Sequence, residues 1–198
     1  MNAIFESLNL SEAGILLWLQ EHLRNPVLTV FFNLITTVGE KGIGFILFAI
    51  ILFCLKRTRR YGTYFCASIA INVLLVNLIL KNLFQRIRPF NLPAMEGILN
   101  PAAWDIPDSF SFPSGHTAIA FATAIVAYFC LKKRYAILLT LLAVLVAFSR
   151  LYLGVHYPTD VLFGALAGSI AAISAALLVR AFAKKFGDIW NKKIPNMF

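Results

Sequence analysis

Three short polar segments interrupt an otherwise apolar sequence, and each contains residue types that can bind or transfer a phosphoryl group. They are Lys81 to Arg88-Pro89, then Ser111 through Pro113-Ser114-Gly115-His116 to Thr117, and finally Ser149-Arg150 through His156 to Asp160. Together they supply three fixed cations, two imidazoles, a carboxylate and a helix start with free amides. Cations and amide donors match the spread negative charge of a phosphoryl group during transfer.

In the first segment, Lys81 and Arg88 are seven residues apart. On a continuous helix they would share one face, two turns from each other, and Pro89 would end that helix. The alternative is that these basic side chains extend toward lipid headgroups. We favour that alternative for Arg86 and leave it open for Lys81 and Arg88.

The second segment stands directly before an apolar stretch and has the features of a helix start. Ser114 can cap the helix, and Gly115 allows another group to approach the backbone closely. The free N–H groups and the helix dipole then form an anion site, which His116 would face as a proton donor. The alternative is an ordinary capped helix with a histidine at the membrane interface.

In the third segment, His156 and Asp160 are four residues apart and would be neighbours on a helix surface. A carboxylate that holds one imidazole nitrogen fixes the tautomer and leaves the other nitrogen as a nucleophile or base. The alternative is a structural His–Asp pair with Arg150 as a marker of topology. That alternative is weakened because Arg150 falls on the side of the membrane where basic residues are disfavoured.

The elements that must position these residues follow from composition. The chain has 198 residues, of which 60% are hydrophobic and 14% charged, whereas soluble domains average about 45–50% and about 25%. This excludes soluble and disordered proteins. The apolar stretches predict helices over 41–56, 61–86, 115–131, 134–149 and 157–183, so we expect an all-α, polytopic transmembrane bundle with five spans.

Basic residues indicate the orientation of this bundle. Twelve of the 18 lie in three groups on alternate connections, at 56–60, 132–134 and 180–193. The positive-inside rule places these groups in the cytoplasm and the three polar segments on the other side. The net charge of +9 therefore reflects topology, and we expect no nucleic-acid partner.

We expect a single domain over 1–198, with interfacial helices in 1–40, the transmembrane core in 41–183 and a basic cytoplasmic tail in 184–198. Residues 12–24 suit a helix at the membrane interface, and 26–38 could lie on the surface or form a sixth span. We favour the surface. The three cysteines show no metal-type spacing, so we expect no metal site.

The three segments, in their order and internal spacing, resemble the signature motifs of the type 2 phosphatidic acid phosphatase (PAP2) family over residues 81–160. The resemblance implies a metal-independent phosphatase without a cofactor, which acts through a phosphohistidine. It implies that His156 is the nucleophile, that Asp160 orients it and that His116 is the general acid. It also implies a phosphate-binding set of Lys81, Arg88, Ser114, Gly115 and Arg150.

We therefore expect a multi-pass enzyme of the plasma membrane that hydrolyses a lipid phosphate or diphosphate at the extracytoplasmic face. Undecaprenyl diphosphate is the preferred substrate, with phosphatidylglycerophosphate and phosphatidic acid as alternatives. Another alternative is a lipid phosphotransferase, and the non-enzymatic one is a lipid-binding or transport protein. A vanadium haloperoxidase, which the same family includes, fits poorly with so many apolar spans. The oligomeric state stays open.

Overall fold

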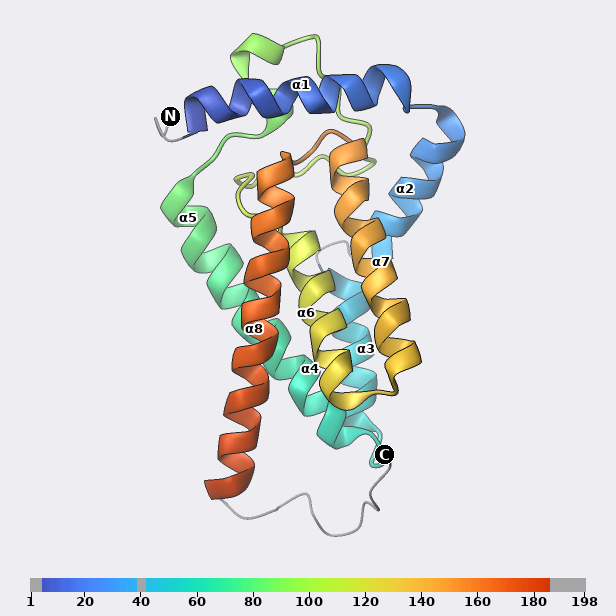
Figure 1. The fold of residues 1–198 in the computed structure, drawn as a ribbon, viewed down its shortest axis with the longest axis vertical. Coiled ribbons are helices and arrows are strands. Elements are labelled where there is room, and N and C mark those ends of the chain that lie inside the picture. The colour runs from blue at the N-terminus through green and yellow to red at the C-terminus, as the bar shows by residue number, and fades with distance from the viewer. Residues whose placement is uncertain (1–4, 39–41, 186–198) are drawn as a thin grey trace.

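A computed structural model describes residues 5–38 and 42–185, so most of the basic tail expected at 184–198 lies outside the described residues. All regular elements in the described part of the chain are helices, which confirms the all-α prediction (Figure 1). The α-helices are α1 (Glu6–His22), α2 (Pro26–Val38), α3 (Ile43–Cys54), α4 (Arg59–Asn72), α5 (Lys81–Phe84), α6 (Gly115–Cys130), α7 (Lys133–Tyr152) and α8 (Pro158–Lys185). A π-helix, η3 (Val73–Leu80), joins α4 to α5, and two 3-10 turns follow, η4 (Pro89–Asn91) and η5 (Pro93–Met95).

Helix α6 lies inside the bundle and packs against α4, α7 and α8 (Figure 1). Small residues let these helices approach closely. A methyl group added at Gly164 of α8 would lie 2.6 Å from the backbone oxygen of Ser114, and one at Gly168 would overlap the backbone of Ala118. The last helix is therefore seated directly on the start of α6, which brings the second and third polar segments together.

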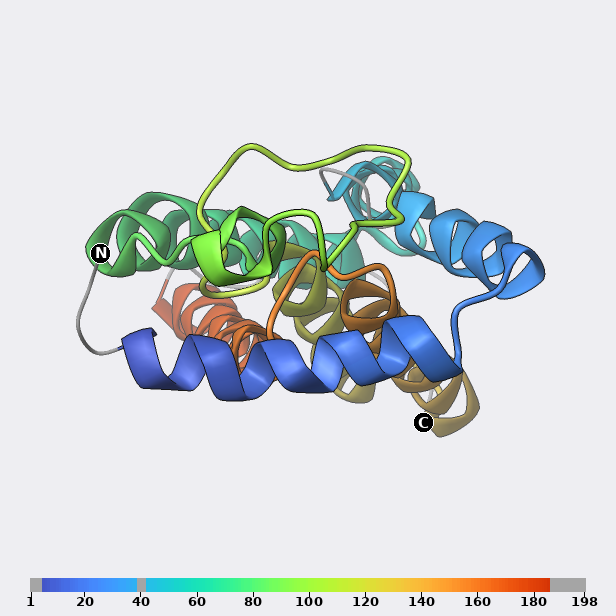
Figure 2. The ribbon, with the colours of Figure 1, turned by 90° about the horizontal axis from the view of Figure 1, so that it is seen from above.

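The N-terminal helices differ in direction. Helix α1 lies across one end of the bundle, whereas α2 runs beside α7 (Figures 1 and 2). Between them, the Asn25 side chain accepts a hydrogen bond from the Leu28 backbone N–H at 3.0 Å, and Pro26 opens α2 as its fixed φ angle favours. The placement of both helices relative to a bilayer stays a prediction.

Three helical stretches are long and apolar enough to cross a membrane: the one that begins at Arg59, α7 and α8. Helices α3 and α6 and most of α2 are apolar but shorter. These helices agree with the expectation of a membrane protein. The number of spans, expected to be five, stays a prediction.

The predicted helix over 61–86 ends earlier than expected. Helix α5 stops at Phe84, because Gln85 takes a left-handed conformation with φ of 45°. Arg88 is extended, as a residue before proline prefers. Lys81 and Arg88 are therefore not two turns apart on one helix, and that prediction was wrong; a loop brings them together.

Candidate active site

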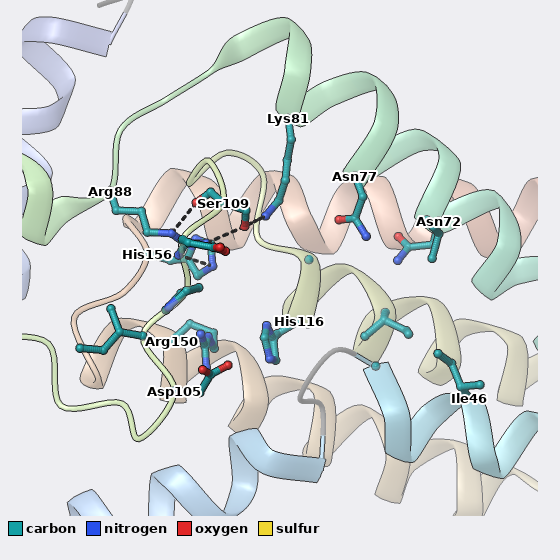
Figure 3. Close-up of a pocket in the computed structure, with 17 residues that line it drawn as sticks. Ile46, Asn72, Asn77, Lys81, Arg88, Asp105, Ser109, His116, Arg150 and His156 are labelled. Atoms are coloured by element: carbon teal, nitrogen blue, oxygen red, sulfur yellow. Dashed lines mark hydrogen bonds between the residues drawn. The ribbon is translucent and has the colours of Figure 1, made fainter.

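All three polar segments meet at one cavity of about 480 Å³ (Figure 3). Eleven of the residues that line it come from these segments or from the adjacent loop: Lys81, Arg88, Asp105, Ile106, Pro107, Asp108, Ser109, Gly115, His116, Arg150 and His156. The chain thus brings two histidines and three cations, from positions up to 75 residues apart, to one cavity. A second cavity of about 240 Å³ shares His116 and Arg150 with the first.

His156 and Asp160 are in contact, as their spacing predicts. His156 lies just before α8, and its Nδ1 is 3.4 Å from Asp160 Oδ2. The same carboxylate oxygen accepts hydrogen bonds from the Ser111 hydroxyl at 2.5 Å and from the Tyr157 backbone N–H at 2.9 Å. These donors hold the carboxylate in place, so it can orient the imidazole and leave Nε2 toward the cations.

Arg88 contacts that second imidazole nitrogen. Its Nη1 donates to His156 Nε2 at 3.3 Å and to the Val155 carbonyl oxygen at 2.8 Å, and its Nε donates to the Ser109 carbonyl oxygen at 2.7 Å. Lys81 Nζ donates to the Ser109 hydroxyl at 2.8 Å. One loop residue therefore holds both cations of the first segment next to the histidine.

Burial and the neighbouring cations Arg88, Arg150 and Lys81 lower the pKa of His156 well below its ordinary value of 6.5. The imidazole is consequently neutral near pH 7 in the unliganded site. A neutral imidazole with a free electron pair on Nε2 is the state that a nucleophile requires.

The second segment contributes a helix start, as predicted, but not through the predicted cap. Gly115 and His116 line the cavity at the N-terminus of α6. Ser114 occupies the N-cap position without a side-chain capping bond; its hydroxyl is buried and accepts a hydrogen bond from the Thr117 hydroxyl at 3.0 Å. Its backbone N–H donates to the Asp160 carbonyl oxygen at 2.9 Å, which ties the two segments together. A role for Ser114 in phosphate binding stays a prediction.

Arg150, the cation of the third segment, also lines the cavity. It is 2% exposed, and its Nη1 donates a hydrogen bond to the hydroxyl of Thr36 in α2. This contact holds the α7 end against α2 and keeps the guanidinium beside His116 (Figure 3).

Arg86 is not at the headgroups, and that interpretation was wrong. Its side chain is fully buried and donates to Asp160 Oδ1 at 2.6 Å, to Glu12 Oε2 at 2.6 Å and to Asn9 Oδ1 at 2.8 Å. The rings of Phe5 and Tyr157 lie over its guanidinium, 4.6 Å and 3.9 Å from it. The left-handed Gln85 turns the chain inward just before Arg86. The hydrogen-bond partners and the aromatic rings then stabilise the guanidinium inside the protein.

Sequence reasoning missed several residues that complete the site. Ser109 holds the cations, and Ser111, which opens the second segment but was given no role, holds the carboxylate. Asp105 and Asp108 of the adjacent loop line the cavity. The one feature of the sequence that could have identified these four residues is that they come shortly before the helix predicted to begin at residue 115. Glu12 and Asn9 carry no such signal, because α1 approaches Arg86 only in the folded chain. Among the described residues, no group of three or more His, Cys, Asp or Glu side chains is placed to hold a metal ion.

Comparisons with known proteins give relatives over much of the chain. An undecaprenyl-diphosphatase from Sulfolobus acidocaldarius is 37% identical over 119 residues, which are 60% of this chain and 55% of that protein. A putative undecaprenyl-diphosphatase of Escherichia coli K12, YbjG, is 37% identical over 141 residues, 70% of this chain and 68% of that protein. The matched region thus spans little more than half the length of the first relative.

The fold has solved counterparts as well. The crystal structure of a transmembrane PAP2-type phosphatidylglycerolphosphate phosphatase from Bacillus subtilis is 28% identical with a TM-score of 0.68. The similarity covers 96% of this chain and 90% of that one. The PAP2 superfamily model matches residues 61–185. This range contains the three polar segments and the helices that bring them to one cavity, and the chain belongs to the PAP2 superfamily.

Proposed function

We propose that this protein is a membrane lipid phosphatase that transfers the phosphoryl group of its substrate first to His156 and then to water. The observation that carries the proposal is the arrangement of His156, with Asp160 at Nδ1 and Arg88 at Nε2 in a cavity lined by two further cations. A protein that only binds or transports a lipid phosphate needs the cations but not a carboxylate-oriented imidazole. The Asp–His contact therefore favours an enzyme.

In the first step, His156 Nε2 attacks the phosphorus, a nitrogen–phosphorus bond forms, and the bond from phosphorus to the leaving oxygen breaks. His116 gives its proton to that oxygen, and a bound anion favours the protonated imidazole that this role requires. Lys81, Arg88 and Arg150 neutralise the charge that develops on the phosphoryl oxygens. Asp160 stabilises the positive charge on the attacking ring through Nδ1.

In the second step, water attacks the phosphohistidine. His116, now neutral, takes a proton from the water as the oxygen–phosphorus bond forms and the nitrogen–phosphorus bond breaks. The products are inorganic phosphate, the dephosphorylated lipid and the original neutral His156, so atoms and protons balance. His116 serves both steps: it is the general acid in the first and the general base in the second.

A diphosphate lipid, with undecaprenyl diphosphate as first choice, is the substrate we propose. Two relatives bear the name undecaprenyl-diphosphatase. We also propose that the site faces the extracytoplasmic side. In support, the α3–α4 and α6–α7 connections, with their basic groups, lie at the end of the bundle away from α1 and the polar segments (Figure 1).

The test is phosphate release by the purified protein in detergent with EDTA present. Undecaprenyl diphosphate, phosphatidylglycerophosphate and phosphatidic acid are compared, and His156→Ala is set beside His22→Ala, an exposed histidine outside the cavity. We expect release from undecaprenyl diphosphate that the His156 variant loses and the His22 variant keeps. Turnover that survives in His156→Ala, or an absence of release from every lipid by folded wild-type protein, would contradict the proposal.

A further inference from the structure

The cavity does not end at the cations and histidines. Beyond His116 it continues between η3, α3 and α6, where its lining includes two carboxamides, Asn72 and Asn77, beside the apolar side chains of Ile46 and Ile119. Figure 3 shows both amides directed from their helix into this part of the cavity. Neither belongs to the three polar segments, and the proposed reaction gives neither of them a role.

The π-helix places these amides in line with Lys81. Asn72, Asn77 and Lys81 are spaced by five and four residues. In an α-helix, with 3.6 residues per turn, Asn72 and Lys81 would lie on opposite sides. The wider winding of η3 brings them to the same side, and Asn72, Asn77 and Lys81 all line the one cavity. The hydrogen bond from the Lys81 N–H to the Val76 carbonyl oxygen, five residues back, belongs to this winding.

One of the amides is buried without a partner. Asn72 is 4% exposed, and its Oδ1 accepts no hydrogen bond from any residue that the structure describes. Asn77, by contrast, is accessible, and its Oδ1 lies 3.5 Å from where a Cβ of Gly115 would be. It thus reaches the N-terminus of α6, where the anion is expected. A phosphate cannot satisfy the Asn72 oxygen, because both groups accept hydrogen bonds. The N–H groups fit an anion instead, since neither Asn72 Nδ2 nor Asn77 Nδ2 donates to any residue that the structure describes.

From this position we propose that Asn77, supported by Asn72, binds the second phosphate of a lipid diphosphate, the group that leaves when the terminal phosphate is transferred. The inference rests on the proposed function and deepens it. With the terminal phosphate beside His156, the leaving oxygen faces His116, and the next phosphate lies beyond it, where the carboxamide N–H groups can donate. A monophosphate lipid has only its alcohol carbon there and gains nothing from the amides.

The test compares farnesyl diphosphate with farnesyl monophosphate, which share one tail and differ only in the second phosphate. Initial rates of phosphate release give kcat/KM for wild type, Asn77→Leu and Asn72→Leu in the same detergent. We expect Asn77→Leu to lower kcat/KM for the diphosphate by about tenfold or more, the usual effect of losing a hydrogen bond to a charged group. For the monophosphate it should change less than about twofold. Asn72→Leu should give the same pattern with a smaller change.

Asn82→Leu is the matched control. Asn82 lies one residue past Lys81, is exposed, and donates to the Leu78 carbonyl oxygen of its own helix at 2.9 Å, so this variant should keep both activities. Asn77→Gln, which retains the donor, should recover part of the diphosphate activity. Equal losses on both substrates in Asn77→Leu would overturn the inference and leave the phosphatase intact. Wild-type protein that hydrolyses neither substrate would instead overturn the proposed function, and the inference with it.

Discussion

Glu12 connects the helix that crosses the end of the bundle to the proposed catalytic centre, and replacing it with glutamine tests that connection. Its carboxylate accepts hydrogen bonds from Arg86 Nη2 at 2.6 Å, from the Thr159 backbone N–H at 2.9 Å and from the Thr159 hydroxyl at 2.8 Å. All three partners are donors. The amide group of a glutamine would therefore face a donor, and Arg86 would keep only Asp160 as a counter-ion.

The loss of stability expected for Glu12→Gln follows from the burial of the ion pair. Breaking a buried ion pair costs about 3–5 kcal/mol of unfolding free energy, and we expect the lower end, about 3 kcal/mol, because Asp160 still neutralises Arg86. For a chain of this size each kcal/mol lowers the melting temperature by about 2–4 °C, so Glu12→Gln should melt about 6–12 °C below wild type. Arg86→Met, which leaves two buried carboxylates unpaired, should melt lower still and lose most of its activity.

Thermal unfolding in one detergent, with phosphate release as a second measurement, provides the assay. Glu21→Gln is the matched control, since Glu21 lies on the same helix but is exposed; it should melt with wild type. If Glu12→Gln also melted within about 2 °C of wild type, the reasoning would be refuted, because the Arg86 pairing would then contribute little to holding α1 in place.

Three further predictions concern the site itself. Because burial and nearby cations lower the pKa of His156, the acid limb of the pH profile of kcat/KM should lie well below pH 6.5. Arg88→Gln removes one of these cations, so it should raise that pKa and move the acid limb to higher pH. An acid limb that stays in place would contradict this prediction. Ser111→Ala removes the hydroxyl that donates to the Asp160 carboxylate and should lower kcat by about tenfold or more, whereas an unchanged kcat would show that the other donors suffice. Gly164→Ala puts a methyl group 2.6 Å from the backbone at the start of α6 and should reduce both phosphate release and melting temperature, while Gly14→Ala, with open space around it, should change neither.

The sequence alone was enough to predict the class of fold and the three polar segments that meet at one cavity. Apolar stretches without charges predict helices because buried backbone in lipid must be hydrogen-bonded within its own segment, and the helices over 115–130, 133–152 and 158–185 confirm this nearly residue by residue. The contact between His156 and Asp160 was predicted from their spacing of four residues, although His156 lies just before α8 and not on it.

Only the tertiary structure decided how the first segment enters the site and what supports it. The left-handed Gln85 and the π-helix η3 change the face on which Arg86, Asn77 and Asn72 lie, and no helical periodicity in the sequence indicates either feature. The ion-pair partners of Arg86 are Glu12 of α1 and Asp160 of α8, each more than seventy residues away in the chain. The sequence therefore suggests a headgroup ligand, whereas in the fold Arg86 is the centre of a buried ion-pair network. Residue spacing determines which side chains meet within one helix. Contacts between helices depend on tertiary packing, which residue spacing does not predict.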